Sequence, residues 1–140
     1  MDSNISFFSE DIEFQLDQPL LYIDWLKNTA HLEGKTLGAL TFVFCTDSYL
    51  HRINLTYLQH DTYTDIITFD YSDGDIIAGD IFISIERVRE NADHFKCSFT
   101  QELSRVIIHG VLHLMGYKDK LAEEKKIMRS KEDFYLTLRS

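Results

Sequence analysis

The residues with the clearest chemical potential lie in one short segment, HGVLHLMGYKD, at positions 109–119. His109 and His113 are four positions apart, so on a helix both imidazoles project from one face and can reach a single ion. Gly116 allows a sharp turn after the second histidine, and Asp119 follows where the chain can return to the same point. Three protein ligands with one open position are typical of catalytic zinc sites. The segment therefore predicts a metal site made of His109, His113 and Asp119.

Two alternatives remain open for these residues. A histidine pair at this spacing also occurs by chance on a core helix, and Asp119 is placed where it could cap the helix that follows, alone or in addition to binding a metal. The HExxH metalloproteases carry a glutamate as general base directly after their first histidine. Here that position is Gly110, so proteolysis of that type is disfavoured.

The elements that must position the site follow from the hydrophobic pattern. The run LSRVIIHGVLHLMG at 103–116 is apolar on nearly all sides, which is typical of a central buried helix. Strands are expected at 5–14, 37–45, 66–71 and 76–84, and the last two form a hairpin around Ser-Asp-Gly-Asp. Other helices are expected at 19–34, 46–58, 85–95 and 121–138. We predict an α+β fold, in which one mixed sheet of about four strands packs against helices and the central helix binds the metal.

The final helix is expected to turn a single apolar stripe towards the core. The residues of this stripe are Leu121, Ile127, Met128, Phe134 and Leu138.

The composition is that of one globular domain. The chain has 140 residues, of which 44% are hydrophobic and 26% charged, with a single proline; disordered and collagen-like classes are excluded. Its apolar runs fall short of the ~18 residues of a membrane span, and its N-terminus lacks the features of a signal peptide. We expect a single domain over 1–140, in the cytoplasm and without a membrane partner. Cys45 and Cys97 fit no metal-binding spacing and are expected to be free thiols that act as small buried side chains.

Charge is divided unevenly along the chain. The net charge is −9, but residues 1–117 carry −11 and residues 118–140 carry +2. A polyanion should therefore approach the C-terminal end, or approach the rest through a metal cation. Six basic residues there form either an RNA-facing patch or an ordinary solvated helix face. They are Lys118, Lys120, Lys125, Lys126, Arg129 and Lys131.

Three motifs resemble the signature of the YbeY family of bacterial metal-dependent endoribonucleases and rRNA maturation factors. They are HGVLHLMGY at 109–117, NLTY with TDIITF within 54–69, and GDIFIS at 79–84. The resemblance implies a zinc-dependent, single-strand-specific endoribonuclease that matures the 3′ end of small-subunit rRNA and acts in ribosome quality control. It also implies RNA and the small ribosomal subunit as partners, no DNA, and one Zn²⁺ per chain, with another divalent transition metal as an alternative.

Three positions depart from that family pattern. Lys118 and Asp119 stand where the family has Asp-His, so an aspartate replaces the third histidine ligand. Leu58 stands where the family has an arginine ascribed to RNA or phosphate contact, and Tyr63 where it has a proline. The residues that move protons in the reaction are therefore left unassigned.

Four further residues are weaker candidates for the site. Asp65 and Asp80 lie at strand ends and could orient a metal-bound water or a ligand imidazole, although such acids more often cap turns. His60 could replace the missing arginine, and Arg105 could approach the cleft or form an ordinary surface salt bridge. Two rival functions also remain: a metal-dependent hydrolase of a peptide or small molecule, and a ribosome-associated factor whose metal is only structural.

Overall fold

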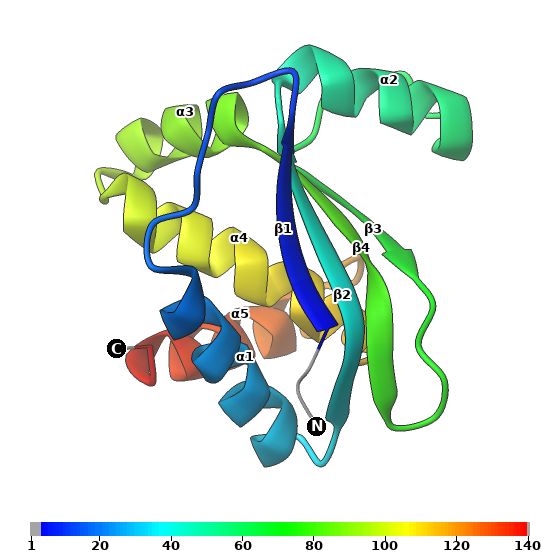
Figure 1. Cartoon of the computed structure of the whole chain (residues 1–140), viewed down its shortest axis with the longest axis vertical. Helices are drawn as coiled ribbons and strands as arrows, with labels where there is room; N and C mark the ends of the chain where they lie inside the picture. Colours follow the sequence, from blue (N-terminus) through cyan, green and yellow to red (C-terminus); the bar gives the residue numbers. More distant parts are fainter. Residues whose placement is uncertain (1–3, 140) are drawn as a thin grey trace.

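The computed structural model describes residues 4–139 and contains four strands and five helices in that part of the chain (Figure 1). The strands are β1 (Asn4–Glu10), β2 (Thr36–Cys45), β3 (Ile66–Asp70) and β4 (Ile76–Ser84). The helices are α1 (Pro19–Leu32), α2 (Asp47–Leu58), α3 (Ile85–Phe95), α4 (Phe99–Leu114) and α5 (Ala122–Thr137). The expected α+β class is confirmed.

The strands form one mixed sheet in the order β1-β2-β4-β3. β1 and β4 both run parallel to β2, while β3 pairs antiparallel with β4 as the expected hairpin. The parallel pairs require crossover connections, and α1 provides the one between β1 and β2. Figure 1 shows α1, α3, α4 and α5 on one side of the sheet, with α2 lying over one end of it.

Helix α4 lies directly on the hairpin because two glycines leave room for it. A Cβ atom on Gly110 of α4 would lie 2.8 Å from Cδ1 of Ile66 in β3, and one on Gly79 of β4 would lie 2.4 Å from the carbonyl oxygen of Phe69. Position 110 therefore faces the sheet and is fully packed. A glutamate there could not point to the histidines, which explains structurally why the base of the HExxH enzymes is absent.

Local residues determine where α4 begins and ends. Ser98 and Gln101 form a reciprocal capping box at the start of the helix. After its last turn, Gly116 adopts a φ of +102°, a region that favours glycine. The chain thus reverses sharply after His113, as the spacing in the motif predicts.

The first strand is shorter than expected. β1 ends at Glu10, and Asp11 adopts a left-handed φ of +64° where an extended segment over 5–14 is expected. The alternating pattern is misleading here because Phe14 and Leu16 still pack against the core from an irregular connection. Tertiary burial, rather than strand pairing, explains those apolar positions.

The expected apolar stripe of α5 is wrong for four of its five residues. Met128 is buried, but exposed positions are occupied by Leu121, Ile127, Phe134 and Leu138. The buried face consists instead of Met128, Glu132 and Tyr135. A carboxylate can occupy this face because two half-buried polar side chains of α4, Arg105 and His109, contact it.

The two cysteines are free thiols, as expected. Cys45 is fully buried, but Cys97 is only half-buried, so the expectation of a buried side chain is wrong for Cys97. Burial, reinforced by nearby acidic residues, raises the pKa of the Cys45 thiol to about 12. A thiol in that environment stays protonated and inert. Among the helices of residues 4–139, none combines the length and the apolar character that a bilayer crossing would need.

Candidate metal centre

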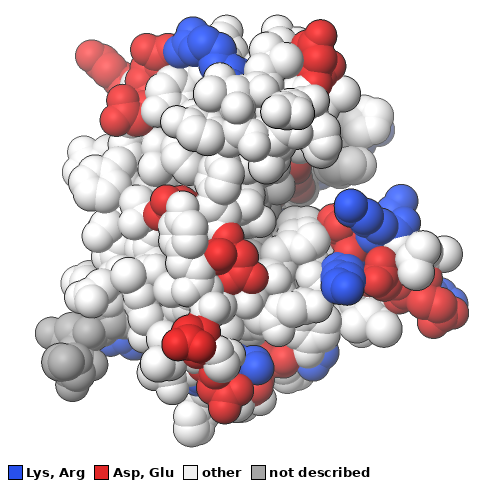
Figure 2. Space-filling model, turned by 90° about the vertical axis from the view of Figure 1, so that its right-hand side faces the viewer, with Lys and Arg blue, Asp and Glu red and all other residues white. Residues whose placement is uncertain are grey.

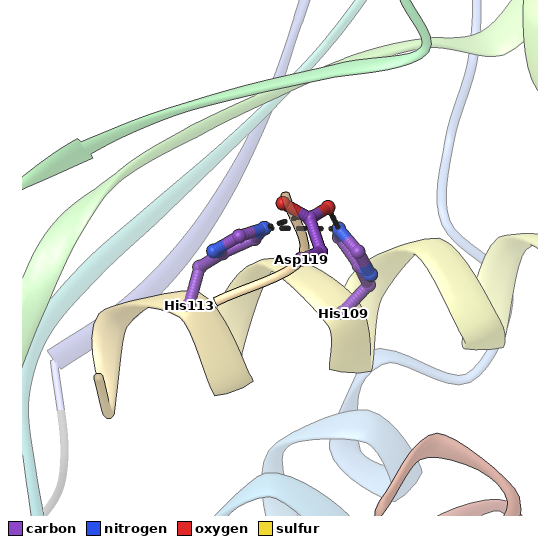
Figure 3. A group of neighbouring side chains, drawn as sticks. All are labelled: His109, His113 and Asp119. Atoms are coloured by element: carbon purple, nitrogen blue, oxygen red, sulfur yellow. Dashed lines mark hydrogen bonds and ion pairs between the residues drawn. The ribbon is translucent and has the colours of Figure 1, made fainter. Parts of the chain in front are cut away.

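The three residues of the predicted metal site converge on one point. His109 and His113 project from successive turns of α4, and their Nε2 atoms lie 3.1 Å apart. Asp119 comes from the connection to α5, and its Oδ2 lies 3.1 Å from Nε2 of His109 and 3.3 Å from Nε2 of His113. Figure 3 shows the carboxylate placed across the two rings, with all three side chains pointing towards one another.

This arrangement fits a transition-metal ion. Ligand atoms about 2.0–2.1 Å from a tetrahedral Zn²⁺ are separated from each other by about 3.3 Å. The three separations between the donor atoms here are 3.1, 3.1 and 3.3 Å. An ion could therefore be held by all three atoms with little rearrangement, and the three side chains are half-buried, so its fourth position would face the solvent.

Asp119 does not cap the following helix. α5 begins at Ala122 with Leu121 as its N-cap, and the side chain of Glu124 accepts the backbone N–H groups of Lys120 and Leu121. The start of the helix is thus satisfied without Asp119. The alternative interpretation of this aspartate as a helix cap is wrong.

His109 is supported from behind by a carboxylate that sequence analysis missed. Its Nδ1 lies 2.6 Å from Oε2 of Glu132, on the buried face of α5. Burial acts to lower the pKa of His109, but the hydrogen bond and the charge of Glu132 outweigh it and raise that pKa. The signal that could have revealed Glu132 is its helical spacing, four residues after Met128 and three before Tyr135, which are both buried.

A groove with a volume of about 980 Å³ opens beside two of the three residues, His109 and Asp119. It is lined by His109 and Asp119, and by Asp65, Glu102 and Arg105. Burial raises the pKa of Asp65 and also that of Glu102, which the charge of Asp65 raises further. The groove thus brings carboxylates of reduced acidity next to the three converging side chains.

Comparison with known proteins identifies the family. The sequence profile described as endoribonuclease YbeY matches residues 4–139. The chain belongs to the YbeY family. It is 54% identical to the endoribonuclease YbeY of Flavobacterium psychrophilum, over 94% of each chain. It is 48% identical to that of Cytophaga hutchinsonii, over 99% of this chain and 97% of the relative.

The fold agrees with that of a solved structure. A protein of Thermotoga maritima, determined in solution, superposes with a TM-score of 0.66 at 26% identity, covering 94% of this chain and 86% of that one. The resemblance to YbeY on three motifs is therefore confirmed over nearly the whole chain. By homology the protein is an endoribonuclease, which also confirms the expected class of enzyme.

The structure shows which of the weaker candidate residues of this YbeY member lie at the groove. Asp65 lines the groove, as described above, whereas Asp80 does not line it. On β4 the neighbouring residues Gly79 and Ile81 face α4, so Asp80 points to the opposite side of the sheet. His60 is exposed in the connection after α2 and is also not among the groove residues.

Arg105 fits neither of its expected roles completely. It lines the groove, yet its guanidinium is held by Glu132 and Asp133, each at 2.8 Å. Glu132 is buried, so the ion pair is not an ordinary surface salt bridge. Arg105 therefore supports the site by holding Glu132, which in turn contacts His109.

The connection that carries Asp119 is anchored by a second carboxylate, Glu33, at the end of α1. Glu33 accepts hydrogen bonds from the hydroxyls of Tyr117 and Tyr135 and from the ammonium of Lys131. One side chain thereby ties α1 to α5 and to the segment between Gly116 and Asp119. The network supports the position of the third converging side chain of this YbeY protein.

The Glu33 network should make stability depend on pH. Burial alone would raise the pKa of Glu33, but the donors Tyr117, Tyr135 and Lys131 outweigh it and lower the pKa below 4.5. A lowered folded-state pKa means that the stabilisation is complete above about pH 5 and is lost as the pH falls through the folded value. We expect Glu33→Gln to lower the free energy of unfolding by about 2 kcal/mol at pH 7.

Urea unfolding of the wild type and of Glu33→Gln between pH 7 and pH 3 measures this effect. The difference between the two proteins should narrow as the pH falls. A difference that stays constant over this range would contradict the assignment of an ionised Glu33.

Proposed function

We propose that this protein is a zinc-dependent endoribonuclease that cleaves single-stranded RNA, with His109, His113 and Asp119 as the metal ligands. The observation that carries the proposal is the convergence of two Nε2 atoms and one carboxylate oxygen within 3.3 Å of each other at the groove. Two imidazoles and one carboxylate are a donor set that suits zinc, and manganese or iron are weaker alternatives.

A bound ion would supply Lewis acidity to a phosphoryl oxygen and acidify a water molecule. The chain itself supplies the positions of the three ligands and a groove in which the substrate can lie. The acidic residues of the groove would repel a bare phosphodiester, so the substrate must be met by positive charge. Basic side chains on the α5 wall serve that purpose.

Lys125 and Arg129 are the basic residues of α5 that line the groove. Of the six basic residues considered as an RNA-facing patch, Lys131 is engaged by Glu33 instead. In Figure 2, Lys and Arg gather, together with acidic residues, on a projecting part of the surface beside a recess. We infer that Lys125 and Arg129 contact the RNA backbone while the metal approaches the scissile phosphate.

The packed position of Gly110 favours RNA over peptide as the substrate. A peptidase of the HExxH type needs a carboxylate at this position, and Ile66 and Ile81 fill the space that its side chain would require. From the sequence resemblance to the YbeY family we further propose that the RNA is the 3′ end of small-subunit rRNA and that the small ribosomal subunit is the partner. We also propose that the chain works in the cytoplasm as one domain in ribosome quality control.

A cleavage assay with metal removal tests the proposal. The zinc-loaded protein is incubated with an unstructured RNA, with a duplex RNA, with a small-subunit rRNA precursor and with casein, before and after chelation and zinc restoration. We expect cleavage of the unstructured RNA and of the precursor near its 3′ end, with loss on chelation and recovery on restoration. Duplex RNA and casein should stay intact.

Contaminating nucleases are excluded by a parallel preparation of His113→Ala, which should be inactive. If the protein cuts casein in a zinc-dependent manner and leaves the RNA intact, the proposal is wrong and the protein is a peptide hydrolase. Zinc binding without any cleavage would favour a ribosome-associated factor with a structural metal.

A further inference from the structure

Glu132 is a buried charged residue whose two oxygens are both engaged. It lies on α5 and is only 5% exposed. Oε2 is 2.6 Å from Nδ1 of His109, and Oε1 accepts a hydrogen bond from Nη1 of Arg105 at 2.8 Å. A buried carboxylate is costly unless its oxygens are satisfied, and here both partners come from α4.

The contact determines which nitrogen of His109 is free. An ionised carboxylate can only accept, so Nδ1 of His109 carries the hydrogen and donates it. The lone pair is then on Nε2, which is the atom that faces His113 and Asp119. The hydrogen bond also fixes the plane of the ring, since Glu132 is itself held by Arg105.

The carboxylate contact at Nδ1 is made to His109 and not to His113. Among residues 4–139, His113 has no carboxylate hydrogen-bonded to its Nδ1; its contacts are made through Nε2. The chain therefore orients His109 through a network between α4 and α5, and within the described residues His113 has no comparable partner at its Nδ1. Loss of the network should weaken His109 specifically.

We propose that Glu132 is a positioning residue for the metal centre: it holds His109 in the tautomer and orientation that bind the ion. Arg105 holds the carboxylate in place through its hydrogen bond. This inference rests on the metal site of the proposed function. Residues that support a metal-binding histidine in this way are typically worth about 10–100-fold in metal affinity.

A purely structural role is the competing explanation, since Glu132 and Arg105 also join two helices. Asp133 offers a matched control, because it accepts a hydrogen bond from Nη2 of the same Arg105 at 2.8 Å. Its side chain is 57% exposed, and its hydrogen bond joins it to Arg105 and not to His109. Asp133→Asn therefore removes a charge from the same arginine and helix without changing the partner of His109.

The decisive measurement is the zinc affinity of the metal-free protein, determined by competition with a chromogenic chelator. In Glu132→Gln the side-chain amide has only one oxygen, so its NH₂ group must face either His109 or Arg105. Turned to His109, it favours the tautomer with hydrogen on Nε2, which cannot bind the ion. We expect zinc binding about 10–100-fold weaker in Glu132→Gln and changed less than about threefold in Asp133→Asn.

A second measurement does not depend on how the variant folds. ¹⁵N NMR of the imidazoles in the metal-free wild type should show neutral His109 with hydrogen on Nδ1. A neutral His109 with hydrogen on Nε2, or equal zinc affinity of folded Glu132→Gln and wild type, would overturn the inference. Full zinc binding by His109→Ala would instead overturn the metal site itself, so the two failures are distinguishable.

Discussion

Replacement of Asp119 by asparagine is expected to lower the affinity for zinc by about 100-fold or more, since loss of a residue that only supports a ligand already costs about 10–100-fold. Asparagine has nearly the same shape as aspartate, so the substitution chiefly removes the negative charge. It also replaces the carboxylate oxygen by an amide group, which binds metal ions more weakly. The two histidines alone would leave an ion with two neutral protein ligands. RNA cleavage should fall in parallel because the ion is retained less often.

Zinc titration of the metal-free variants checks this prediction. His113→Ala serves as the reference for a lost ligand and should bind no stoichiometric zinc. Asp93→Asn, at an exposed position of α3, makes the same charge change elsewhere and should bind zinc as the wild type does. Wild-type affinity in Asp119→Asn would exclude this residue from the ligand set and leave two histidines as the site.

The largest loss of stability is expected for Gly79→Ala. The added Cβ would lie 2.4 Å from the carbonyl oxygen of Phe69 and 3.1 Å from both methyl groups of Leu114. The carbonyl belongs to the backbone of β3 and cannot rotate away, so β3 or α4 must move. We expect the free energy of unfolding to fall by about 3 kcal/mol. Because Leu114 directly follows His113, zinc affinity should fall as well.

Urea unfolding at pH 7 measures the loss, and Gly34→Ala provides the contrast. Gly34 has a φ of +71° with no atom near the position of a Cβ, so that substitution has only the cost of the left-handed backbone, about 1 kcal/mol. If Gly79→Ala is no less stable than Gly34→Ala, α4 is not packed against the hairpin as closely as described.

Most of the secondary structure could be predicted from local patterns. The helix with the two histidines, the hairpin and the turn at Gly116 are each determined by residues a few positions apart, and the structure agrees with them. The prediction failed at 11–14 and on the face of α5. In both places contacts with distant parts of the chain decide which residues are buried. Phe14 packs on the core without belonging to a strand, and the polar residue Glu132 lies on the buried face of α5.

The convergence of His109, His113 and Asp119 is contained in the sequence because an eleven-residue segment holds all three. The pitch of the helix aligns the histidines, and the left-handed glycine returns the chain. Their convergence therefore follows mainly from local geometry, with Glu33 and Glu132 supporting it from other helices, and their role as metal ligands stays a proposal.

The support of the site was decided by the tertiary structure alone. Glu132 is 23 residues from His109, and Glu33 is 84 residues from Tyr117. In the sequence each resembles an ordinary surface acid, since a buried charge is unfavourable without partners. Only the packing of α5 against α4 and α1 brings Arg105, His109 and the tyrosines within hydrogen-bond distance. The contacts of these two carboxylates are thus a consequence of the fold, and apart from the helical spacing of Glu132 the local sequence carries no sign of them.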